Sequence, residues 1–259
     1  MWAVSLSFLG EWFVVPHGVG LGLAVLFGAL WLAAYWPPLF VKPWLWVVLI
    51  PGAFLPLLAI AFVQIPAQAL VGQLLMRIWP PLVLNQWLLL AAIPQILLSG
   101  IVQEGAKMLP AVFWWWRRNR TLTLRMGLVI GAVAGAAFGT YEAVWTHHKM
   151  FMAGWSWQLV QTQGPLALAG IWERFFAMGF HIAAGAISGW GLARGWGWKF
   201  YLLAAFLHAL LNYSIVLLQA RIFSLVQVEI YLAGIAILVS FAVLRLRWRS
   251  GGDEDFETA

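Results

Sequence analysis

The sequence predicts an all-α integral membrane protein, built as a polytopic bundle of about seven transmembrane helices. Of its 259 residues, 63% are hydrophobic and 9% are charged, whereas an ordinary soluble domain has roughly 45–50% apolar and about 25% charged residues. So little charge cannot cover a water-facing surface of this size, and most of the chain must face lipid. The chain has no cysteine, which excludes disulfides, thiolate metal sites and a cysteine nucleophile.

Seven apolar runs, separated by charges or Pro-rich turns, are each about as long as a helix needs to cross a bilayer, roughly 20 residues. We expect spans near residues 18–36, 44–64, 87–116, 126–146, 166–193, 200–218 and 227–244. Segment 66–84 mixes Gln68, Gln73 and Arg77 with apolar residues. We expect it to be an interfacial helix or a re-entrant piece on the outer side. Residues 1–259 then form a single membrane domain.

The Lys and Arg residues favour one set of connections, and the positive-inside rule predicts that this set is cytoplasmic. The favoured set contains Lys42, Arg117, Arg118, Arg120, Arg125, Arg194, Lys199, Arg245, Arg247 and Arg249. The opposite set contains Arg77, Lys149 and Arg221. We therefore expect the N-terminus outside and the C-terminus in the cytoplasm, with residues 245–259 as a charged tail. The net charge of +6 then reflects orientation and implies no nucleic-acid partner.

A few polar side chains fall inside the predicted spans, where an ionisable group is costly and usually marks a functional site. They are Gln103, Glu104, Lys107, Glu142, Glu173, Arg174, His181, His208 and Asn212. Counting about 1.5 Å of rise per residue from the nearest cytoplasmic charge, Glu104, His181 and Asn212 lie roughly 20 Å deep. The same count places His208 at roughly 13 Å. We expect these four residues to form one reactive layer.

The other charged residues are expected to form ion pairs, because pairing lowers the cost of holding a charge inside the membrane. Lys107 follows Glu104 by three residues and so shares its helix face. Arg174 can pair with Glu173 or with Glu142, in a second layer nearer the outer face. Lys107 is expected to neutralise Glu104.

Glycine recurs every four residues in the predicted fourth span, at Gly127, Gly131, Gly135 and Gly139. In the fifth span, His181 is followed at the same interval by Gly185 and Gly189. Small residues at this spacing let two membrane helices approach closely. We interpret both series as packing surfaces rather than sites.

The reactive layer is compatible with three kinds of chemistry. In hydrolysis, Glu104 acts as general base, His181 orients or binds a water or metal, and His208 and Asn212 donate hydrogen bonds to an oxyanion. Glu104, His181 and His208 would then form a site for a divalent metal such as zinc. The alternatives are proton relay or substrate binding in a transporter, and porphyrin ligation by the two histidines. Only hydrolysis uses all four residues.

Taken in order, these residues resemble the PrsW-type intramembrane proteases, which are distantly similar to the CAAX prenyl proteases and the bacteriocin-processing membrane proteases. The family pattern is a Glu-Glu-x-x-Lys helix, a glycine-rich helix with Phe-x-x-x-Glu-Asn, an Arg seven residues before a His, and a His-x-x-x-Asn helix. The matching residues lie within 100–213, a protease-like core of four spans. They are Gln103-Glu104 with Lys107, Phe138 with Glu142-Ala143, Arg174 with His181, and His208 with Asn212.

The resemblance implies a multi-pass peptidase of a bacterial-type plasma (inner) membrane. Its partners would be membrane lipid and a single-span or membrane-anchored protein substrate, such as an anti-sigma factor. Both a metal-dependent and a glutamic mechanism remain open.

Two residues depart from the family pattern: Gln103 replaces the first Glu, and Ala143 replaces the Asn. Because the amide of Gln103 is not basic, this residue cannot act as a general base. The alternative hypothesis is therefore a catalytically degenerate relative that serves as a structural or binding subunit of a larger membrane complex.

Overall fold

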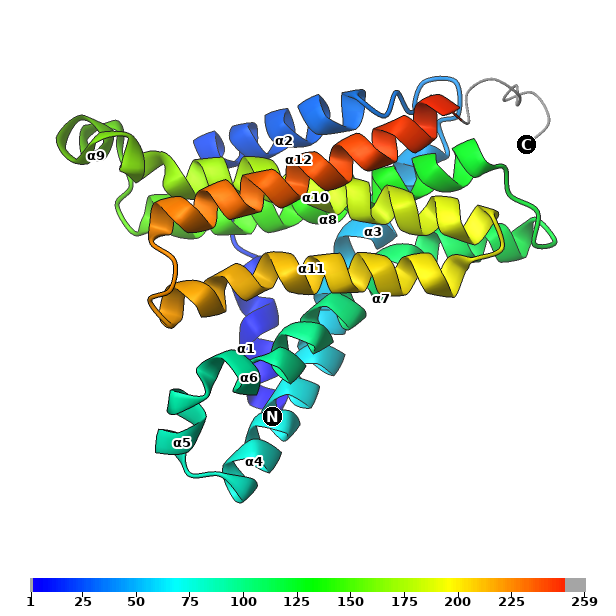
Figure 1. Cartoon of the computed structure of the whole chain (residues 1–259). Coiled ribbons are helices and arrows are strands. Elements are labelled where there is room, and N and C mark those ends of the chain that lie inside the picture. Colours follow the sequence, from blue (N-terminus) through cyan, green and yellow to red (C-terminus); the bar gives the residue numbers. More distant parts are fainter. Residues whose placement is uncertain (1, 250–259) are drawn as a thin grey trace.

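The structure, a computed structural model, describes residues 2–249, and every regular element in that range is a helix (Figure 1). The first six are α1 (Trp2–Trp12), α2 (Gly18–Ala33), α3 (Leu45–Ala59), the π-helical turn η1 (Ile60–Gln64), α4 (Ile65–Ile78) and α5 (Pro81–Gln86). The next four are α6 (Leu88–Ala91), α7 (Ile93–Arg117), α8 (Leu124–Met152) and α9 (Trp157–Gln163). The last four are the 3-10 turn η2 (Gly164–Leu168), α10 (Ala169–Ala193), α11 (Gly197–Gln219) and α12 (Leu225–Arg249).

The predicted all-α membrane fold is confirmed. Within residues 2–249, six helical segments are long and apolar enough to cross a membrane, and α2 is a shorter apolar helix of 16 residues. This agrees with a protein of about seven spans. The helix of the first predicted span ends at Ala33 instead of residue 36, before Trp36, whose φ is 45°, and Pro37-Pro38. The chain is a multi-pass membrane protein.

The helix of the second predicted span is longer than the sequence suggested. α3, η1 and α4 run as one continuous helix from Leu45 to Ile78, although we expected a separate interfacial segment at 66–84. A π turn widens the helix without breaking it, and Pro66 stands near the start of α4, in its first turn. Figure 1 shows α4 and α5 projecting from the bundle. The position of segment 66–84 relative to the lipid stays a prediction.

α8 and α10 form the centre of the bundle and are its most buried helices. A Cβ added at Gly131 would collide with the backbone carbonyl of Gly185, and one added at Gly185 would collide with that of Gly131. The predicted packing role of the two glycine series is thus confirmed. A Cβ at Gly135 would collide with the carbonyl of His181, so close packing also fixes the position of this histidine.

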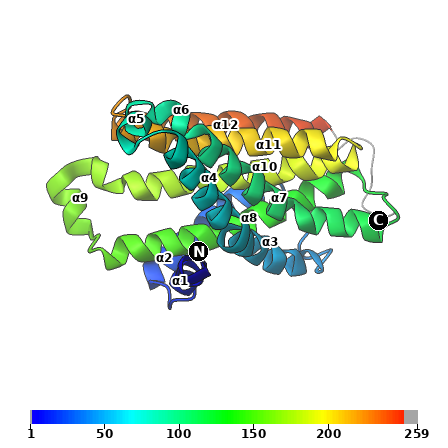
Figure 2. The ribbon, with the colours of Figure 1, turned by 90° about the horizontal axis from the view of Figure 1, so that it is seen from below.

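The connections rich in Lys and Arg lie together at one end of the bundle. Figure 1 shows the α2–α3, α7–α8 and α10–α11 connections at the end where α12 finishes, and Figure 2 shows α9 projecting at the other end. The turn after α10 uses Gly195, whose φ of 82° suits glycine. Residues 245–249 of the predicted tail complete α12, and residues 250–259 lie outside the described residues. Which end is cytoplasmic stays a prediction.

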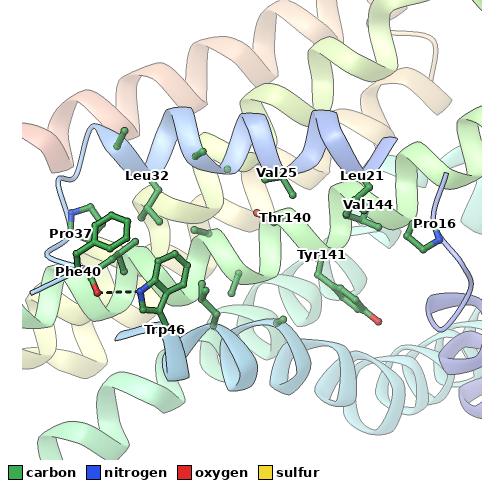
Figure 3. A pocket seen from close by; sticks show the side chains of 18 of the residues that line it. Pro16, Leu21, Val25, Leu32, Pro37, Phe40, Trp46, Thr140, Tyr141 and Val144 are labelled. Carbon is green, nitrogen blue, oxygen red and sulfur yellow. Dashed lines mark hydrogen bonds between the residues drawn. The ribbon is translucent and has the colours of Figure 1, made fainter. Parts of the chain in front are cut away.

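An apolar groove of about 1250 Å³ separates α2 from α3, both of which pack on α8 (Figure 3). Its floor on α8 includes Thr140, Tyr141 and Val144. One wall is formed by α2, and Trp46 of α3, which donates its indole N–H to the Leu39 carbonyl at 3.1 Å, lines the other. Because consecutive helical residues are about 100° apart, the groove occupies a different face of α8 from Glu142.

Candidate active site

Glu104 and Lys107, one turn apart on α7, form a buried ion pair. The Nζ of Lys107 lies 2.5 Å from Oε1 of Glu104, so the predicted neutralisation is confirmed. His208 of α11 places Nδ1 2.5 Å from the same carboxylate oxygen. If the neutral imidazole donates from Nδ1, its Nε2 is left with the free lone pair.

His181 of α10 completes this group, which we call the inner cluster: Glu104, Lys107, His181 and His208. Its Nδ1 lies 3.0 Å from the Nζ of Lys107, and its Nε2 lies 3.0 Å from Oε2 of Glu142. A carboxylate only accepts hydrogen bonds, so Nε2 carries the proton and Nδ1 presents its lone pair to the cluster. Glu142 therefore fixes the histidine tautomer from outside the cluster.

Glu142, Glu173 and Arg174 form the outer cluster. Arg174 lies 2.9 Å from Glu142 and also pairs with its neighbour Glu173, so both predicted partners are bound at once. The side chains of Arg174, Glu142 and Glu173 are 14%, 22% and 23% exposed. Those of Glu104 and Lys107 are 0% exposed, so the outer cluster is the more accessible of the two.

Asn212 is placed differently from the other predicted site residues. Its Nδ2 donates to the hydroxyl of Ser99 at 3.0 Å, and that hydroxyl donates to the carbonyl of Ile96 at 2.7 Å. Among the hydrogen bonds of residues 2–249, none joins Asn212 to Glu104 or to either histidine. Of the four residues in the predicted reactive layer, Glu104, His181 and His208 lie close together. Asn212 instead links α11 to α7.

Several residues around the two clusters were not predicted from the sequence. Ser99 accepts a hydrogen bond from Asn212, and Gln64 accepts one from Gln103. Neither Ser99 nor Gln64 belongs to a recognisable sequence motif. Glu229 was detectable, because it is a carboxylate inside the predicted span 227–244. It interacts electrostatically with Glu173 and Arg174, and its Oε2 is buried without a hydrogen-bond partner.

Aromatic rings shield the histidines of the inner cluster. Phe138, part of the predicted motif, packs its ring edge-on to His181 with 5.1 Å between the ring centroids. Phe180 lies 5.7 Å from the ring of His208 in the same edge-on arrangement. These contacts make the surroundings of the cluster apolar, which strengthens the electrostatic interactions inside it.

The donor atoms of the inner cluster suit a divalent metal. One ligand atom each from Glu104, His181 and His208 can be chosen so that all three lie within 4.8 Å of one another. Two imidazoles and one carboxylate are a ligand set of catalytic zinc sites, which keep a fourth position open. Oε2 of Glu104 is buried with no hydrogen-bond partner, and the ammonium of Lys107 already lies between Glu104 and His181. The residues therefore suit a cation, and a metal that binds Nδ1 of His181 would have to displace the ammonium of Lys107.

Comparison with known proteins agrees with this geometry. A family model described as PrsW family intramembrane metalloprotease matches residues 41–244. The chain belongs to the PrsW family. The match includes every residue of both clusters and extends well beyond the motif-bearing segment 100–213. No curated protein and no solved structure matches the chain. Membership of the PrsW family favours a peptidase over a transporter or a porphyrin protein.

Proposed function

We propose that this PrsW-family protein hydrolyses a peptide bond of a membrane-anchored protein at the inner cluster. The observation that carries the proposal is the carboxylate of Glu104, buried beside two imidazoles with one oxygen still unpartnered. An unpaired buried acceptor is costly, so it is expected where a substrate or a water molecule binds. The family match supplies the reaction class.

Glu104 is the residue best placed to act as general base. Its Oε2 accepts a proton as the water oxygen attacks the carbonyl carbon of the scissile bond, and the proton then passes to the leaving nitrogen as the C–N bond breaks. Lys107 balances the carboxylate charge. Asn212 stabilises the oxyanion through the amide hydrogen that Ser99 does not take. His208 was also expected to donate to the oxyanion, but its Nδ1 hydrogen is directed at Glu104, so its Nε2 offers only a lone pair.

In the metal-dependent alternative, Glu104, His181 and His208 would hold a divalent metal such as zinc, and Glu104 would be a ligand instead of the base. When bound, such a metal would supply a Lewis acid that could polarise a carbonyl and lower the pKa of a bound water. Glu142 then supports the site as a carboxylate hydrogen-bonded to a ligating histidine, an arrangement that orients the ring and raises its basicity. Arg174 holds Glu142 in place.

The substrate class follows from the position of the cluster. Because the inner cluster is buried among helices able to cross a membrane, a substrate must reach it from within or beside the bilayer. A single-span or membrane-anchored protein meets this requirement. We place the enzyme in a bacterial-type plasma (inner) membrane, with lipid as its other partner.

The test is cleavage of a panel of single-span reporter proteins by Glu104→Gln. This change keeps the shape of the side chain and removes the base, so we expect cleavage to fall by about 10²–10⁴-fold. The matched control is Glu11→Gln, which alters an exposed carboxylate paired with Lys149 and should cleave like the wild type. Gel filtration and circular dichroism check that both variants are folded.

Wild-type cleavage rates in Glu104→Gln would contradict the proposed base. If the wild type cleaves no reporter, and instead co-purifies with a stable set of membrane proteins, the degenerate-relative hypothesis is favoured.

A further inference from the structure

Glutamine side chains from α7, η1 and α4 form a hydrogen-bonded chain beside the inner cluster, which we call the glutamine ladder. The Nε2 of Gln103 donates to Oε1 of Gln64 at 3.0 Å, and the Nε2 of Gln64 donates to Oε1 of Gln68 at 3.4 Å. The Nε2 of Gln68 donates to the backbone carbonyl of Gln95 at 2.8 Å. The ladder ends next to Glu104.

The direction of the ladder is set at its far end. A backbone carbonyl can only accept, so Gln68 must turn its amide nitrogen toward Gln95 and its oxygen toward Gln64. The Nε2 of Gln95 also donates to the carbonyl of Gln68 at 3.0 Å, which locks this end. Gln64 must therefore donate to Gln68 and accept from Gln103. As a result, Gln103 turns its nitrogen to the ladder and its oxygen away from it.

The π turn brings Gln64 into the ladder. Gln64 is the last residue of η1, and it is only 8% exposed. A π turn adds one residue to a helical turn and so rotates the following side chains relative to a regular helix. Such turns occur frequently at functional sites.

Two buried acceptors on consecutive residues are left without partners. Oε1 of Gln103 and Oε2 of Glu104 each lack a hydrogen-bond donor, and the two residues are 7% and 1% exposed. A buried acceptor with no donor is destabilising. A single water has two hydrogens and could satisfy both acceptors, whereas a substrate peptide group has one.

We propose that Gln103 holds the attacking water: its Oε1 accepts one hydrogen of the water while Oε2 of Glu104 accepts the other. The inference rests on the proposed function and adds a residue to it. Gln103 thus keeps an acceptor at the position where the family has its first Glu, although it cannot be a base. The ladder gives the acceptor its orientation.

Three substitutions distinguish a water-holding role of Gln103 from a purely structural role, in which the ladder only holds α4 against α7. Gln103→Met removes the acceptor, and we expect kcat to fall roughly 10–100-fold with KM changed by less than about twofold. Gln103→Glu keeps an acceptor but cannot donate to Gln64, so kcat should recover relative to Gln103→Met while the melting temperature falls. Gln95→Met removes only the side-chain bond to the Gln68 carbonyl and leaves the direction of the ladder set by the Gln95 carbonyl, so it should lower the melting temperature with kcat within about threefold.

Equal kcat in Gln103→Met and the wild type would overturn the inference, as would the same loss of kcat in Gln95→Met. A change confined to KM would overturn it too, because the acceptor would then bind substrate. If Gln103→Met does not fold, Gln64→Met replaces it, and an unchanged kcat in that variant counts against the ladder. Loss of cleavage in Glu104→Gln together with normal Gln103→Met refutes this inference alone, and normal cleavage in both refutes the proposed function.

Discussion

The inner and outer clusters share helix α10 and are joined by the hydrogen bond between His181 and Glu142, yet they differ in how their polar atoms are satisfied. In the outer cluster, Arg174 binds both neighbouring carboxylates. In the inner cluster, Glu104 keeps an unpartnered oxygen, and ligand atoms of Glu104, His181 and His208, one from each, lie within 4.8 Å of one another. A satisfied ion pair stabilises a structure, whereas a buried carboxylate oxygen with no partner indicates a binding site.

Lys107→Met should have the largest effect on stability, and it tests whether the buried ion pair of the inner cluster matters more to folding than the more exposed pairs of the outer cluster. Removing Lys107 leaves Glu104 buried without its counter-charge, which costs about 3–5 kcal/mol for a fully buried pair. We expect a large loss of folded protein, measured by thermal unfolding in detergent. Glu173→Gln, in the more exposed outer cluster, is the control and should lose much less. Equal losses would remove the distinction between the two clusters.

Gly135→Ala tests the packing that positions His181, the residue that joins the clusters. The added Cβ would collide with the His181 carbonyl, so we expect a loss of about 1–3 kcal/mol in unfolding free energy and reduced cleavage per folded molecule. The control is Gly139→Ala, where the added Cβ would meet the Sδ of Met178 at 2.8 Å. A flexible methionine can move aside. A larger loss of unfolding free energy or cleavage in Gly139→Ala than in Gly135→Ala would contradict this packing role.

Glu142→Gln should have a smaller effect on stability. It tests whether Glu142, a residue of the outer cluster, also acts on the inner cluster through His181. The amide oxygen can still accept from Nε2 of His181, but the negative charge that raises the basicity of the ring is gone. We expect metal affinity or cleavage to fall about 10–100-fold with the fold intact. Glu173→Gln, which contacts Arg174 but no histidine, should leave both readouts nearly unchanged. Identical behaviour of the two variants would place Glu142 in the outer cluster only.

The sequence was sufficient to predict the fold and most of both clusters. Charge is so scarce in this chain that each in-span charge stands out, and regular helical spacing correctly paired Lys107 with Glu104. Depth along a helix can be counted, so the approach of Glu104, His181 and His208 was predictable. The direction in which a side chain points around its helix axis is harder to predict than its depth. The hydrogen bond from Asn212 to Ser99 was therefore not predicted.

The glutamine ladder could not be predicted at all. It depends on a π turn at 60–64, which no local sequence pattern predicts. It also depends on α4 continuing the helix of α3, where we expected a break. Gln103 consequently appeared only as a defect in a motif. Its hydrogen bond to Gln64 gives it a position and an orientation that the motif alone could not supply.

The central claim is that Glu104, His181 and His208 form one metal site. It is tested most directly by measuring bound metal in protein purified from membranes and dialysed against zinc. We predict about one zinc per chain in the wild type, and loss of that zinc in His181→Ala and His208→Ala. Asn212→Ala, which alters a residue outside the ligand set, should retain it. Unchanged zinc content in both histidine variants, or none in the wild type, would contradict the claim.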